Sequence, residues 1–76
     1  MAETVYTSTT SFENIVGERV VSISVGSGAS VVIEVEHGNG QWVEIDTFHQ
    51  DAVQALTFGY GRNYRFTVTG DASFAI

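Results

Sequence analysis

The residues whose types and spacing could support chemistry lie in one short segment, DTFHQD. Asp46, His49 and Asp51 place one imidazole and two carboxylates within six positions, a set that could hold a hard or borderline cation. A calcium loop needs more oxygen ligands in a fixed order, and the EF-hand pattern is absent. We therefore interpret the segment as a solvated loop in which the aspartates cap a turn, and we expect no metal and no cofactor.

A nucleophilic enzyme would need an ordered arrangement of serine, histidine and acid. The nucleophile elbow Gly-x-Ser-x-Gly does not occur, because glycines directly flank Ser27 in GSGAS. The pairs Gly26/Gly28 and Gly59/Gly61 are similar to phosphate-binding loops, but such loops open a helix and no helical period follows either pair. A domain this small also has little room for a pocket that excludes water. We expect no catalytic residues and no enzymatic activity.

Aromatic side chains are numerous for the length of the chain, nine in 76 residues. Tyr64, Phe66 and Phe74 fit a hydrophobic core. Others fall at hairpin ends or on outward positions, where an aromatic ring serves as core, as a protein-interface anchor or as a platform for a sugar. The candidates for an interface, with the last residue of the chain included, are Tyr6, Phe12, Trp42, Phe48, Tyr60 and Ile76.

Composition excludes several classes of partner. The net charge is −6 and lysine is absent, so the chain lacks the basic stripe that nucleic-acid binding requires. No apolar run approaches the roughly 20 residues of a membrane span, and the N-terminus lacks the features of a secretory signal. We therefore expect a protein made in the cytoplasm that binds neither nucleic acid nor membrane.

The elements that carry these residues are β-strands. Apolar residues alternate with polar ones in ERVVSISV, SVVIEVEH and NYRFTVTG, which is the period of half-buried strands. The segment His37-Gly38-Asn39-Gly40 predicts a tight hairpin, with Val43 and Ile45 on the inner face of the returning strand and Trp42, Glu44 and Asp46 on its outer face. The strand over residues 53–58 has apolar groups on both faces, so its register stays open.

Six strands at spacings near ten residues predict an all-β fold, a small antiparallel β-sandwich or barrel of about six to seven strands. Residues 15–76 form its single domain. Residues 1–14, rich in Thr and Ser, are expected to be an N-terminal arm or a poor edge strand.

The apolar ending at Ile76 raises the question of what covers the last strand. The chain contains no proline and no lysine, two devices that protect sheet edges. The core is thin and cysteine is absent, so self-association is the remaining means of stabilisation. We expect a homo-oligomer, a dimer or a trimer, in which the N-terminal arm could cross to a neighbour.

Residues 20–76 resemble the small β-sandwich virion accessory proteins of tailed bacteriophages. The resemblance rests on a hairpin with a tryptophan, a Gly-Arg-x-Tyr-Arg-Phe-like strand and a short final strand, at Gly38, Gly40, Trp42, Gly61, Arg62, Tyr64, Arg65, Phe66, Val68 and Gly70. It implies a non-enzymatic structural protein of the virion that decorates or cements the capsid or attaches to the tail, with other virion proteins as partners. The alternative is a small carbohydrate-binding module that uses Trp42 and Tyr60.

Overall fold

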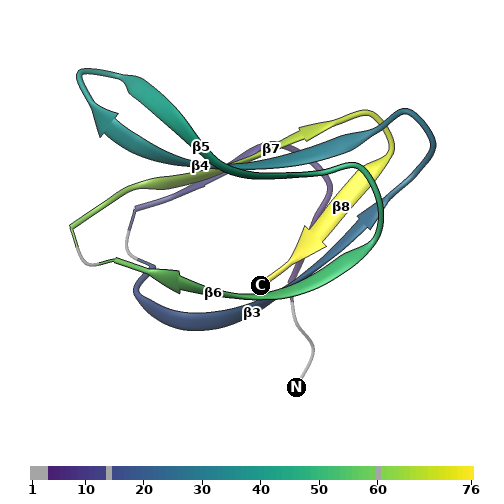
Figure 1. The fold of residues 1–76 in the computed structure, drawn as a ribbon, viewed down its shortest axis with the longest axis horizontal. Helices are drawn as coiled ribbons and strands as arrows, with labels where there is room; N and C mark the ends of the chain where they lie inside the picture. Colours follow the sequence, from purple (N-terminus) through teal and green to yellow (C-terminus); the bar gives the residue numbers. More distant parts are fainter. Residues whose placement is uncertain (1–3, 14, 60) are drawn as a thin grey trace.

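The computed structural model describes residues 4–13, 15–59 and 61–76, and its architecture is a sandwich of two antiparallel four-stranded sheets (Figure 1). The first sheet has the order β1-β8-β3-β6 and the second the order β2-β7-β4-β5. The strands are β1 (Val5–Tyr6), β2 (Thr10–Phe12), β3 (Gly17–Val25), β4 (Ser30–Gly38), β5 (Gln41–Phe48), β6 (Ala52–Phe58), β7 (Tyr64–Thr69) and β8 (Ala72–Ala75). The prediction of an antiparallel sandwich is confirmed.

The strand count exceeds the prediction because the N-terminal segment contributes two short strands. Val5 and Tyr6 pair with β8, and residues 10–12 pair with β7. The two strands lie in different sheets of the same sandwich. The expected arm is therefore not confirmed, and the alternative of a poor edge strand describes the segment.

The last strand is covered within the chain. β8 lies between β1 and β3, with Phe74 opposite Tyr6 on one side and opposite Ile23 on the other. The chain itself therefore completes the ladder of this strand, where the sequence favoured coverage by a partner. The physical reason is a long-range pairing of the two chain ends, which the local pattern of either end does not contain.

The core lies between the two sheets and is built by the alternation that the sequence predicts. Its largest fully buried side chains are Phe66, Phe74, Ile33, Val21 and Val31. The rings of Phe66 and Phe74 stack across the sheets with their centroids 4.3 Å apart. Truncating either ring to alanine would cost about 3–5 kcal/mol, which is a large part of the stability of a small domain.

The hairpin between β4 and β5 has the tight turn that the sequence predicts. Gly38 pairs with Gln41, which leaves Asn39 and Gly40 as a two-residue loop. Both have positive φ, 55° and 76°, as the favoured hairpin turns require. The tip of the hairpin extends beyond the other strands as a twisted ribbon (Figure 1).

The register of β5 differs from the prediction. A β-bulge interrupts its pairing with β4, because Ile33 is opposite Asp46 whereas Glu34 is opposite Glu44. Ile45 is the extra residue, and beyond it the alternation changes face. Asp46 therefore shares the inner face with Ile33, and its predicted outward position is wrong, as is the simple inward position of Ile45, whose side chain is 48% exposed.

Candidate functional site

Hydrogen bonds and a cation–π contact join Trp42, Arg65, Glu34 and Thr67 on the outer face of the β2-β7-β4-β5 sheet, and we call this group the Arg65 cluster. Glu34 lies opposite Arg65 on β7 and opposite Glu44 on β5. The Nε and Nη2 atoms of Arg65 donate to the two carboxylate oxygens of Glu34 at 3.0 and 3.1 Å, and the hydroxyl of Thr67 donates to Glu34 at 2.6 Å. The fork geometry fixes both side chains.

The electrostatics of this cluster keep Glu34 ionised. The hydrogen bonds from Arg65, together with the bond from Thr67 and the charge of Arg65, hold the pKa of Glu34 below its ordinary value of 4.5 against the opposing effect of burial. Without Arg65, the carboxylates of Glu34 and Glu44 would face each other across neighbouring strands, an arrangement that destabilises a sheet. Arg65 therefore stabilises the junction of β4, β5 and β7.

Trp42 is the one sequence-predicted interface residue in this cluster. It is half-buried and lies opposite Glu36 on β4. The guanidinium carbon of Arg65 is 4.4 Å from the centroid of its ring, which is a cation–π contact. Because Arg65 covers one face of the ring, a sugar or a protein could stack only on the other face.

Tyr6 and Phe12 contact the core of their own chain. The ring of Tyr6 stacks on Phe74 with centroids 5.0 Å apart, and Phe12 packs edge-on against Phe66 at 5.6 Å. Both side chains are half-buried. They therefore tie the N-terminal strands to the sandwich, and their contact with a second chain stays a prediction.

The other predicted interface residues lie apart from one another. Phe48 is half-buried at the end of β5, opposite Val31. Ile76 is half-buried beside Tyr6 and Arg19 at the end of the chain. Tyr60 lies outside the described residues. Of the five described candidates, Tyr6, Phe12 and Ile76 line one pocket, whereas Trp42 and Phe48 lie on opposite faces of β5.

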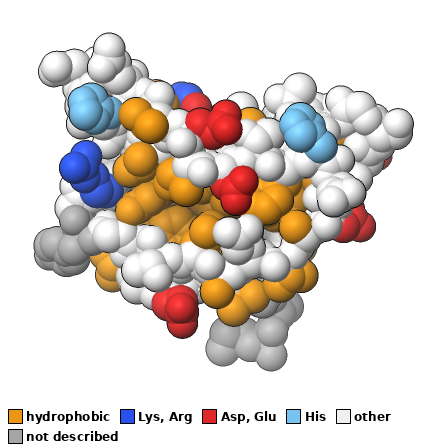
Figure 2. Space-filling view, in the orientation of Figure 1, with side chains coloured by type: hydrophobic (Ala, Val, Ile, Leu, Met, Phe, Trp, Pro, Cys, Tyr) orange, Lys and Arg blue, Asp and Glu red, His pale blue; other side chains and the backbone are white. Residues whose placement is uncertain are grey.

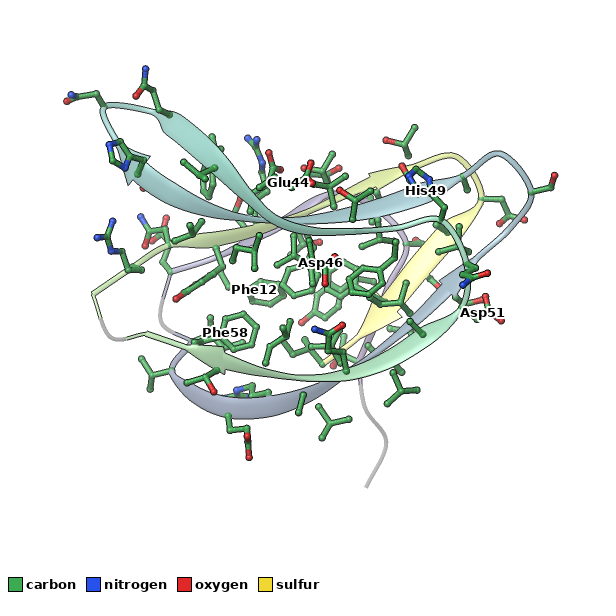
Figure 3. The ribbon with its side chains drawn as sticks, viewed as in Figure 1. Phe12, Glu44, Asp46, His49, Asp51 and Phe58 are labelled. Carbon is green, nitrogen blue, oxygen red and sulfur yellow. The ribbon has the colours of Figure 1, made fainter. Side chains whose placement is uncertain are left out.

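The DTFHQD segment comprises the last three residues of β5 and the turn that leads to β6, and its side chains do not converge. The carboxylate of Asp51 accepts a hydrogen bond from the backbone N–H of Val25 at 2.8 Å, and that of Asp46 accepts one from the N–H of Thr47 at 2.9 Å. Asp46 projects between the sheets, whereas His49 and Asp51 lie at the far end of the turn (Figure 3). Among the described residues, no three His, Asp or Glu side chains are grouped to hold a metal ion.

β5 and β6 are the last strands of their sheets, and both lie on the side of the sandwich that faces the viewer in Figure 1. We call this region the β5/β6 opening, and its inward positions are Val43, Asp46, Phe48 and Leu56. Val43 is 49% exposed, and Phe48 and Leu56 are half-buried. Figure 2 shows hydrophobic side chains gathered in the middle of this face, with acidic groups among and around them. The sandwich is therefore incompletely closed here.

The β6 edge, residues 52–58, borders this opening. Its register with β3 runs without interruption from Phe58 opposite Gly17 to Ala52 opposite Ile23. Val53 and Ala55 are on the outer face, and Val53 is 73% exposed. The neighbouring Val20 on β3 is 59% exposed and lies opposite Ala55. Sequence reasoning missed this surface, although the uncharged run AVQALTF was the signal that could have found it.

Within the described ranges, no helix is long and apolar enough to cross a lipid bilayer. No family model, no curated protein and no solved structure matches the chain. The arguments for function therefore rest on the surfaces of the molecule itself.

Proposed function

We propose that the chain is a non-enzymatic structural protein that acts through protein–protein contacts of its β-sandwich. The observation that carries this proposal is the β5/β6 opening with its uncharged β6 edge, beside which the described part of the chain places no further strand. Exposed apolar side chains beside unpaired backbone groups are the features by which sheets bind other chains. A protein with this surface gains stability when a partner covers it.

The setting that we propose is a phage virion, where the chain would decorate or cement the capsid or attach to the tail. The support for it is the resemblance of residues 20–76 to small virion accessory proteins. Two of the residues that carry this resemblance, Trp42 and Arg65, belong to the Arg65 cluster, which gives the outer face of the second sheet a fixed shape. A fixed polar surface is suited to a specific contact with a neighbouring protein.

The test is binding to assembled particles encoded by the genome that carries this gene. Purified chain is mixed with such particles, and the bound amount is measured after sedimentation. We expect saturable binding at a fixed number of copies per particle. Trp42→Ala should weaken it, whereas Val5→Thr, at an exposed position of β1 in the other sheet, should leave it unchanged.

A glycan array with the same two variants separates this proposal from the carbohydrate-binding alternative. Trp42 is the ring on which that alternative depends, and one face of it remains uncovered by Arg65. Binding to a glycan that is lost in Trp42→Ala, with no binding to particles, would overturn the structural role.

A further inference from the structure

The four strands that end the two sheets differ in their ability to pair with another chain. β1 has two residues and β2 has three, so neither offers a ladder of useful length. β5 has eight residues and β6 has seven. A strand of seven residues spans about 24 Å, and only β5 and β6 are long enough to add a partner strand.

β5 carries three features that oppose such pairing. The bulge at Ile45 breaks the regular spacing of its backbone groups. Asp46 points inward from an edge strand, and Glu44 adds a second charge on the outer face. Bulges and inward charges on edge strands are the devices by which natural sheets avoid edge-to-edge association.

β6 carries none of these features. Its sequence AVQALTF contains no charged residue and no proline, and its seven pairs with β3 are free of register shifts. Because backbone groups of alternate residues point to opposite sides of a strand, about half of them face away from β3. Among the described residues, β6 has no strand on that second side.

We propose that β6 pairs antiparallel with β6 of a second copy of this chain, so that the two β1-β8-β3-β6 sheets join into one sheet of eight strands. This inference deepens the proposed function, on which it rests, by naming the partner and the contact. In the pairing with the longest overlap, Ala55 lies opposite Ala55 of the second copy. Val53 then lies opposite Thr57, and Gln54 opposite Leu56.

A second copy fits this edge better than an unrelated charged partner for an electrostatic reason. Each chain has a net charge of −6, so two copies repel wherever their acidic residues meet. The β6 edge is the long edge without acidic residues, and a two-fold axis through Ala55 brings only uncharged side chains of β6 together. Because β6 has no charged side chain, it offers neither an acidic nor a basic partner a charge to recognise.

The pairing also covers the β5/β6 opening. Stable interfaces bury about 1,200–2,000 Å², and one pair of strand edges contributes only a part of that area. Because β5 and β6 end the two sheets on the same side, joining the β6 edges turns the two openings toward each other. Leu56 and the exposed Val43 are then shielded by the partner, while Asp46 keeps the two β5 edges from pairing.

The experiment introduces a charged side chain at position 55 of the full chain and measures self-association. Ala55→Lys and Ala55→Glu each place like charges opposite each other in the dimer, and each should weaken self-association about tenfold or more. An equimolar mixture of the two variants should restore it as a heterodimer, which a folding defect would not permit. Thr47→Lys and Thr47→Glu, on the outer face of β5, are the matched controls and should associate like the original chain. Sedimentation equilibrium gives the masses.

The outcomes separate the pairing from the proposed function. A chain that is monomeric throughout the micromolar range, or a dimer that is unchanged by both Ala55 variants, overturns the pairing even where the chain binds particles. If the Ala55 variants break the dimer and their mixture restores it, the pairing is supported even where the chain does not bind particles. A failure to bind particles overturns the virion role alone.

Discussion

The strands β5 and β6 occupy equivalent positions, each at the end of a four-stranded sheet on the same side of the sandwich. Their edges nevertheless differ in regularity and in charge. β5 has a bulge, an inward Asp46 and an outward Glu44, whereas β6 is regular and uncharged. If both edges were open, copies could join without limit, because a heterologous contact that does not close produces filaments. Because β5 is protected and only β6 can pair, association is expected to stop at a dimer.

The largest effect should follow from removing the protection of β5. The double variant Glu44→Thr, Asp46→Val removes both charges that oppose pairing of β5 and leaves only the bulge, and we expect assembly to continue beyond the dimer into species of increasing mass. Light scattering across a concentration series measures this change.

A matched control for that variant removes two charges elsewhere. Glu13 follows β2 and Asp71 lies in the turn between β7 and β8, and both are exposed. The variant Glu13→Gln, Asp71→Asn changes the net charge equally and should keep the mass of the original chain. Growth of the control would show that net charge sets the assembly size, and a β5 variant that remains a dimer would show that these two carboxylates do not protect the edge.

The next effect concerns the ion pair between Glu34 on β4 and Arg65 on β7. Arg65→Met removes the two hydrogen bonds to Glu34 and leaves that carboxylate facing Glu44. We expect a loss of about 1–3 kcal/mol in the free energy of unfolding at neutral pH, measured by urea denaturation. Arg62→Met is the control, since Arg62 donates only an exposed 3.3 Å bond to the carbonyl of Glu36; its cost should stay below about 0.5 kcal/mol. Equal losses would mean that the cluster has no special role.

The smallest effect is a pH dependence of the same junction. Because the pKa of Glu34 is lowered in the folded chain, the stability that its ionised form supplies is complete above the ordinary value of 4.5 and disappears as the pH falls through the lowered value. Glu34→Gln should therefore give a flatter curve of unfolding free energy against pH below 4.5, by less than about 1.4 kcal/mol per pH unit. Parallel curves for the two proteins would contradict this assignment.

The sequence predicted those parts of the fold that depend on local pattern. Alternation placed Val31 and Ile33 in the core, and the Asn39-Gly40 turn fixed the β4–β5 hairpin. The bulge at Ile45 was not predictable, because a change of face within a strand depends on the partner strand rather than on its own alternation.

The pairing of β1 with β8 could not be predicted from the sequence either. β1 has only two residues, and its place beside β8 depends on contacts across the whole chain. The candidate site was predicted only in part for the same reason. Trp42 was singled out, but Glu34 and Arg65 become its neighbours only when β4, β5 and β7 assemble.

The most direct test of the central claim is disulfide formation by single cysteine variants, since the chain has no cysteine of its own. Residues opposite each other in an antiparallel pair have Cα atoms about 4.5–5.5 Å apart, within the range that a disulfide spans. Ala55→Cys should therefore form a covalent dimer under mild oxidation. Val53→Cys alone should not, because its copies would be about 14 Å apart, but it should cross-link when mixed with Thr57→Cys. Cross-linking of Ala55→Cys that is no greater than that of Val53→Cys would contradict the pairing.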